Sequence, residues 1–281
     1  ATTLAGLTWL TDYLDLIDLL RDETDLNVWT TVIISCHHLH RILDETQEQP
    51  FRERIRGVFN AALECLTWSP REGETELERQ LRGELINALG TVAEDKTCQQ
   101  RARDLYAQYE KDSASVERNL VPALVSIIAH TGTGADYEKF YAKFKNAKTP
   151  QEETRYLFAL GAFRRPELID RTLMMTLSGE VRTQNAPYLM RGILLIREAR
   201  EKAWSFMKEH WNEMLNKYPD NSIPRMCEGI IGLVTPELEA DVRKFFTEHP
   251  VKQGAKQIQQ HLERLRIAVA CKERWKDLLR P

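Results

Sequence analysis

Apolar residues recur along the chain at the spacing of an amphipathic helix, and no strand-type alternation interrupts them. Residues 29–43, 75–91 and 203–218 each predict one helix, and a last long helix is expected from Ile258 to Leu279. The apolar stripes of the first three helices are Trp29, Val32, Ile33, Cys36, Leu39, His40 and Leu43, then Leu77, Leu81, Leu85, Ala88 and Leu89, then Trp204, Met207, Trp211, Leu215 and Tyr218. The pattern predicts an all-α fold.

Helix start signals and short connections separate these stripes. Thr149-Pro150 and Thr235-Pro236 each place a threonine at the N-cap and a proline at the first helical position. No segment rich in Pro, Gly or Ser divides the chain, so residues 1–281 are expected to form a single all-helical domain. Successive helix pairs joined by short turns favour an irregular α-superhelix, a solenoid of HEAT/armadillo-like pairs. A single compact bundle is the alternative.

Composition and charge exclude several classes of protein. The chain is 42% hydrophobic with a net charge of −3, which excludes global disorder and argues against broad electrostatic binding of nucleic acid. No apolar run is long enough for a membrane span, and no signal peptide is visible. The charge is uneven, because residues 1–48 are acidic and residues 252–280 are basic. Solvated helix faces explain this uneven charge; alternatively, the two ends attract each other or face different partners.

The cysteines and histidines do not form a recognisable metal site. The five cysteines are widely spaced and are expected to be buried, reduced thiols, which fits a cytoplasmic location. His37 and His40 would share a helix face beside Cys36, but core packing explains this cluster better than zinc. Motifs for phosphate binding, dinucleotide binding, zinc peptidase chemistry and nucleophilic catalysis are absent from the sequence. We therefore assign no catalytic residue, no metal ligand and no cofactor to this chain.

Two further groups look like sites but have ordinary explanations. His210 and Glu213 lie three residues apart, as an exposed helix pair does. The aromatic stripe of Trp204, Met207 and Trp211 is expected to pack in a core rather than line a ligand box.

Several ordered segments carry a resemblance to a known family. Gly6-Leu7, the leucines that follow, and the segment 21–29 ending in Trp29 resemble the opening helices of the C-terminal domain of gluzincin aminopeptidases. These are the aminopeptidase N, puromycin-sensitive and endoplasmic-reticulum aminopeptidase relatives. Leu66-Thr67-Trp68 resembles a later segment, with Thr67 in place of the usual glycine. Residues 147–161 and 203–211 resemble two further helices of that domain, so the resemblance covers nearly the whole chain.

The resemblance implies a non-catalytic domain that caps the active site of a zinc-dependent aminopeptidase and helps to bind or gate peptide substrates. The zinc and its ligands would lie in a separate catalytic domain of the same polypeptide, which this chain lacks. The expected partners are that catalytic domain and peptides, with no nucleic acid and no membrane. The chain alone is expected not to be an enzyme, whereas the parent protein would be a metallo-aminopeptidase.

Three residues are candidates for contact with a peptide, although the resemblance does not assign them. Arg155 and Arg191 lie in otherwise apolar helices, and Tyr188 precedes Arg191 by three residues. A guanidinium group suits a peptide carboxylate because it pairs with both oxygens. The alternative is that each arginine reaches solvent or pairs with a local acid.

Two other functions remain open at this point. A free-standing helical-repeat scaffold that binds a protein partner would fit the same pattern of helices. An enzyme with an unrecognised site would need a constellation of catalytic residues that the sequence does not display.

Overall fold

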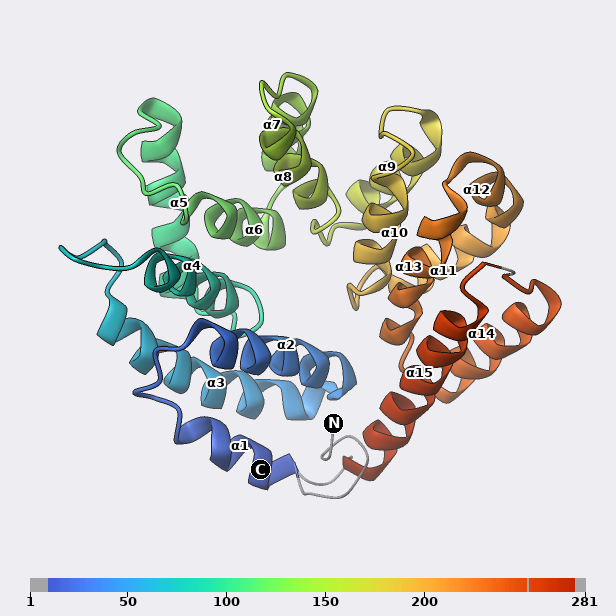
Figure 1. Cartoon of the computed structure of the whole chain (residues 1–281), viewed down its shortest axis with the longest axis horizontal. Coiled ribbons are helices and arrows are strands. Elements are labelled where there is room, and N and C mark those ends of the chain that lie inside the picture. Colours follow the sequence, from blue (N-terminus) through green and yellow to red (C-terminus); the bar gives the residue numbers. More distant parts are fainter. Residues whose placement is uncertain (1–9, 252, 276–281) are drawn as a thin grey trace. The chain divides into compact units, whose positions relative to one another are not determined.

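The computed structural model describes residues 10–251 and 253–275, and every regular element in these ranges is a helix (Figure 1). The all-α prediction is confirmed. The chain forms two compact units, residues 1–131 with 274–281 and residues 132–273, which we describe separately. The HEAT/armadillo type of repeat and the single domain over residues 1–281 stay predictions.

Unit 1 is built around one central helix. Its helices are α1 (Leu10–Asp18), α2 (Leu26–Ile42), α3 (Glu45–Leu66), α4 (Glu76–Gly90), α5 (Lys96–Lys111) and α6 (Val121–Thr131). Helix α4 packs against α2, α3, α5 and α6 (Figure 1). The apolar stripe of α2 is buried as predicted, and Trp29 contacts Phe59 of α3 edge-on at 5.9 Å between ring centroids.

Unit 2 is also built around one central helix, the short helix α10. Its elements are α7 (Gly134–Lys145), α8 (Pro150–Leu160), α9 (Pro166–Ser178), α10 (Ala186–Leu194), α11 (Arg200–Glu209), α12 (Trp211–Lys217), η1 (Asp220–Ser222), α13 (Ile223–Cys227), η2 (Glu228–Gly232), α14 (Pro236–Glu248) and α15 (Ala255–Trp275). The last two residues of α15 are grouped with unit 1. Helix α10 packs against α8, α9, α11, α13 and η2.

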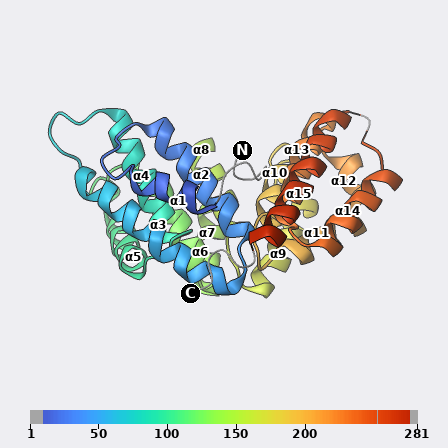
Figure 2. The same cartoon turned by 90° about the horizontal axis from the view of Figure 1, so that it is seen from below.

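Aromatic residues fill the far part of unit 2. Helices α11, α12 and α14 lie side by side (Figures 1 and 2), and Trp204, Trp211 and Phe245 meet there with ring centroids 5.1–5.3 Å apart. Met207 is fully buried beside them. The prediction that this stripe is core is confirmed. Aromatic pairs at such distances and near-perpendicular angles add about 0.5–1.5 kcal/mol each beyond their burial.

The predicted helix starts are present in the structure. The Thr149 side chain accepts a hydrogen bond from the backbone N–H of Glu152, and the Thr235 side chain accepts one from Leu238. A proline follows each threonine in the first turn, where its missing N–H leaves no hydrogen bond unmade.

Four sequence predictions need correction. The single helix expected over residues 203–218 is interrupted at His210, which separates α11 from α12. The His210 ring contacts the Phe206 ring at a tilt of 45°, with 4.4 Å between ring centroids. Leu77, in the first turn of α4, is 62% exposed, and Leu215 is 38% exposed. Cys65 is exposed, because α3 turns that position to solvent, while the other four cysteines are buried as expected. Leu279 lies outside the described residues.

Candidate functional site

Helix α10 carries two of the three predicted site residues on the side that does not enter the core. Pro187 occupies its first turn, and six apolar residues of the helix are buried. Tyr188 and Arg191 lie three residues apart on the opposite side and are half-exposed. The guanidinium carbon of Arg191 lies 5.5 Å from the centre of the Tyr188 ring, within the range of a cation–π contact.

Two glycines let the segment after α13 approach α10 closely. A Cβ atom added at Gly229 would lie 2.7 Å from the Cβ of Leu194, and one at Gly232 would lie 2.5 Å from the Leu194 carbonyl oxygen. Neither position can hold a side chain without movement of the backbone. The close approach places Glu228, the residue before Gly229, against Arg191.

Glu228 lies between two arginines from different helices. Its carboxylate accepts a hydrogen bond from Arg191 of α10 at 2.9 Å and another from Arg264 of α15 at 3.3 Å. Burial alone would raise the pKa of Glu228, but the charges of Arg191 and Arg264 outweigh that effect and hold the pKa below its ordinary value. Glu228 is therefore ionised at neutral pH, and one negative charge is shared by two positive ones.

His261 completes this group from α15. Its Nε2 atom lies 3.1 Å from the carbonyl oxygen of Pro224, so Nε2 carries the proton and donates. Its Nδ1 atom is buried and has no partner among the described residues. Burial is the largest influence on His261 and lowers its pKa, although Glu228 acts in the opposite direction. The ring is therefore uncharged at neutral pH.

The third predicted residue stands apart from this group. Arg155 of α8 is half-buried and makes no hydrogen bond or ion pair with another described residue.

Arg225 of α13 is exposed and lies three residues before Glu228. Arg191 and Arg264 outnumber Glu228, so the surface that these residues of α10, η2 and α15 form has an excess of positive charge. We call it the α10 surface.

Sequence patterns identified the arginine of this surface but not its partner. Arg191 is conspicuous as a charge in an apolar helix, whereas Glu228 lies 37 residues further along the chain, in a short helical segment without a motif. Arg191 does pair with an acid, but that acid is the distant Glu228 and not the local one that the alternative supposed. Contact with a peptide stays a prediction for Arg155, Tyr188 and Arg191.

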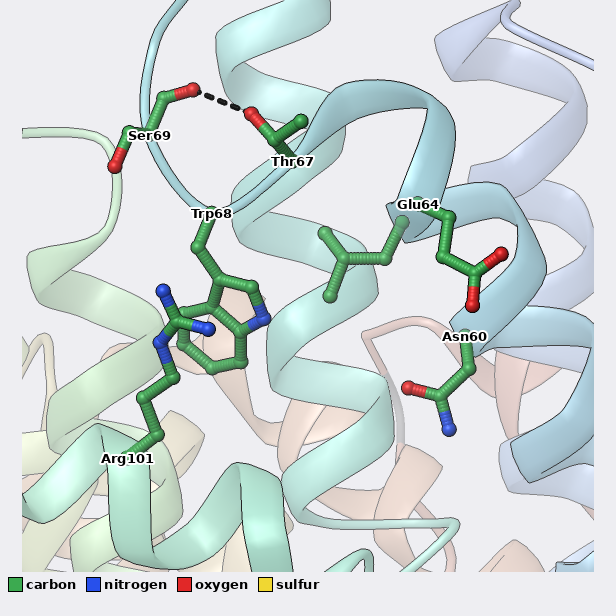
Figure 3. A pocket seen from close by; sticks show the side chains of 7 residues that line it. Asn60, Glu64, Thr67, Trp68, Ser69 and Arg101 are labelled. Atoms are coloured by element: carbon green, nitrogen blue, oxygen red, sulfur yellow. Dashed lines mark hydrogen bonds between the residues drawn. The ribbon is translucent and has the colours of Figure 1, made fainter.

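Unit 1 contains a separate pocket of about 390 Å³ at the end of α3 (Figure 3). It is lined by Asn60, Leu63, Glu64, Thr67, Trp68, Ser69 and Arg101. The guanidinium carbon of Arg101 lies 4.3 Å from the centre of the Trp68 ring. The volume falls within the usual range of about 300–1,000 Å³ for ligand pockets.

The cysteine and histidine groups singled out in the sequence are explained by packing and surface pairs. Cys36 is fully buried, and burial raises the pKa of its thiol to about 12. His40 contacts Glu48 at 2.9 Å, and His210 contacts Glu213 at 3.3 Å near the surface. Within residues 10–251 and 253–275, no three His, Cys, Asp or Glu side chains are arranged to hold a metal ion, and no helix has the length and apolar character needed to cross a membrane.

Comparison with known proteins connects this fold to one family. The family model described as the ERAP1-like C-terminal domain matches residues 1–267. The chain is 28% identical over 284 residues to Aminopeptidase M1-B of Oryza sativa subsp. japonica, which covers 96% of this chain and 31% of the relative. It is 28% identical to Aminopeptidase M1 of Arabidopsis thaliana, covering 95% of this chain and 31% of the relative.

A yeast relative gives the same picture. The Alanine/arginine aminopeptidase of Saccharomyces cerevisiae is 27% identical over 226 residues, which cover 79% of this chain and 26% of the relative. The chain thus spans about a third of the length of the curated relatives that it matches.

Proposed function

Because the chain belongs to the ERAP1-like C-terminal domain family of aminopeptidases, we propose that it is the non-catalytic, peptide-binding part of a zinc-dependent aminopeptidase. The zinc and the hydrolytic residues would then lie in a catalytic domain of the same polypeptide. Relatives about three times as long as the matched segment support this division. In this role the chain caps the active site and gates the entry of peptides.

The α10 surface is the observation that carries the peptide-binding part of the proposal. Arg191 and Arg264 share a single carboxylate, so their guanidinium groups retain donors that Glu228 does not use. A carboxylate of a peptide could accept hydrogen bonds from both arginines and pack its neighbouring side chain on Tyr188. Arg155, which has no hydrogen-bond or ion-pair partner within residues 10–251 and 253–275, is a second proposed contact.

Glu228 has a definite role in this proposal. It orients Arg191 and Arg264 and keeps two like charges close together when no peptide is bound. A peptide carboxylate is attracted by the two arginines and repelled by Glu228, so the site favours moderate affinity. Moderate affinity suits a surface that must release its substrate after each cycle.

The experiment uses the full-length parent enzyme with Arg191→Gln. We expect a weaker dependence of kcat/KM on peptide length, mainly through a raised KM, because the contact lies away from the bond that is cleaved. Single aminoacyl chromogenic substrates should be hydrolysed at the original rate. Arg118→Gln, an exposed arginine of unit 1, is the matched control. An unchanged length preference in Arg191→Gln would remove this residue from the peptide site.

The cytoplasm is proposed as the location on separate grounds. Cys36, Cys98, Cys227 and the exposed Cys65 are free thiols, and free thiols are typical of a reducing compartment. A free-standing scaffold remains the alternative function, and it would show no effect of the α10 surface on peptide hydrolysis.

A further inference from the structure

The pocket at the end of α3 is bordered by a strained residue. Thr67 has φ 59° and ψ 172°, a backbone conformation that is adopted almost only by glycine. Its hydroxyl donates to the Ser69 carbonyl oxygen at 2.7 Å, as Figure 3 shows. Strain of this kind persists only where the surroundings hold the backbone in place, and it is common where a protein binds a ligand.

The buried side chain of Arg82 donates hydrogen bonds to the backbone of this segment. The Nε atom of Arg82 donates a hydrogen bond to the Thr67 carbonyl oxygen at 2.8 Å, and its Nη2 atom donates one to the Leu66 carbonyl oxygen at 3.0 Å. Arg82 also pairs with Glu74, and both side chains are fully buried. Breaking such a pair costs several kcal/mol, so the backbone just before Trp68 is fixed before any ligand arrives.

Trp68 in turn positions Arg101. The Arg101 guanidinium group lies over the indole ring at 4.3 Å, and it makes no hydrogen bond or ion pair with another described residue. Stacking therefore fixes the plane of the group while its N–H donors remain available. A stacked arginine with free donors is well arranged to bind a carboxylate.

Other unused polar groups lie across the pocket from Arg101. Glu64 and Asn60 come from the same side of α3, and neither side chain forms a hydrogen bond within the described part of the chain. The Trp68 indole nitrogen is also unpartnered there, and Figure 3 shows it turned toward the side of Asn60 and Glu64. Leu63 also lines the pocket and contributes apolar surface to it.

We propose that this pocket binds a short zwitterionic peptide. The peptide ammonium group contacts the Glu64 carboxylate, and its terminal carboxylate accepts hydrogen bonds from Arg101. An apolar side chain packs on Leu63 and the edge of Trp68, and the Asn60 amide bonds the peptide group. Glu64 and Arg101 carry opposite charges and share the pocket with the apolar surface of Leu63 and Trp68. This combination favours a zwitterionic peptide over a simple anion or cation. The site lies in unit 1 and is independent of the α10 surface.

The test is a titration of the 281-residue chain with the dipeptide Leu-Leu, followed by the NMR signal of the Trp68 indole N–H. Trp68→Phe identifies that signal. We expect the signal to shift with added dipeptide. N-acetyl-Leu-Leu and Leu-Leu amide should each bind roughly tenfold more weakly, since each loses one charge-assisted contact.

Matched variants assign each charge. Glu64→Gln should bind the acetylated and free dipeptides equally, and Arg101→Gln should bind the amidated and free dipeptides equally. Both side chains are exposed, so the fold should be retained. Glu72→Gln and Arg118→Gln change the same charges outside the pocket and should have no effect.

Three results would overturn the proposal. The first is an unmoved Trp68 signal at millimolar dipeptide. The second is equal binding by the charged and blocked dipeptides. The third is loss of the shift in Arg191→Gln, which would place the dipeptide on the α10 surface instead.

Discussion

Replacing Thr67 by glycine should stabilise the protein, although most substitutions to glycine destabilise. Thr67 ends α3 with φ 59° and ψ 172°, where any Cβ atom is crowded by its own backbone. Such a conformation costs a non-glycine residue about 1–3 kcal/mol. Glycine removes that cost but gives the unfolded chain more freedom, worth about 0.5–1 kcal/mol. Thr67 is exposed, so no packing is lost, and the hydrogen bond of its hydroxyl to Ser69 that is lost is also exposed to solvent.

Alanine at the same position isolates the strain. Thr67→Ala and Thr67→Gly both lose the hydroxyl that donates to Ser69 at 2.7 Å, so they differ only in the Cβ atom. We expect the glycine variant to be more stable than the alanine variant by roughly 0.5–2 kcal/mol, the strain less the entropy.

Urea unfolding followed by circular dichroism measures this difference. Gly57→Ala provides the opposite control, because Gly57 lies inside α3 with open space around its Cβ position, and alanine should stabilise there by about 0.5–1 kcal/mol. If Thr67→Ala proves as stable as Thr67→Gly, the backbone at this position is not strained and the reasoning fails.

Three further predictions concern burial and close packing. A thiol reagent should label only Cys65 quickly in the native chain and all five cysteines after denaturation, and fast labelling of a second thiol would contradict the burial of the others. Gly232→Ala should destabilise the protein by about 1–3 kcal/mol in urea unfolding, because its Cβ would meet the Leu194 carbonyl oxygen, and a neutral effect would show that η2 is not tightly docked. Burial raises the pKa of Tyr218 from 10.0 to about 12. The stability that the buried, protonated Tyr218 gives the folded state is therefore fully present below pH 10 and is lost as the pH rises to 12. Unfolding free energy should fall there by up to about 1.4 kcal/mol per pH unit, and Tyr218→Phe should reduce that slope.

The sequence predicted the features that depend on neighbouring residues. Thr149 and Thr235 cap their helices through bonds to residues three positions ahead, and the aromatic spacing from Trp204 to Trp211 is set by the helical period. The apolar stripe of α2 is buried for the same reason. Local periodicity and capping were sufficient for the all-α fold.

Features that depend on distant residues could not be predicted in this way. The partner of Arg191 is 37 residues away, and its approach depends on glycines whose role is visible only beside Leu194. Exposure of Cys65 depends on which side of α3 receives a neighbour. Thr67 is an exception, because it stands where the resembled family has a glycine. The sequence therefore already indicated an unusual backbone conformation at this position.

The interruption at His210 also escaped the periodic pattern. The stripe from Trp204 to Trp211 continues in phase across it, because both residues pack against the same Phe245. A periodic pattern records which side chains share a core and not whether the helix between them is continuous.

The division between this chain and a separate catalytic domain is tested most directly by measuring zinc content and aminopeptidase turnover together. Chromogenic aminoacyl substrates would be assayed with the 281-residue chain and with its full-length parent under the same conditions. We predict zinc and turnover in the parent and neither in this chain. Stoichiometric zinc or turnover in the 281-residue chain itself would contradict the accessory role.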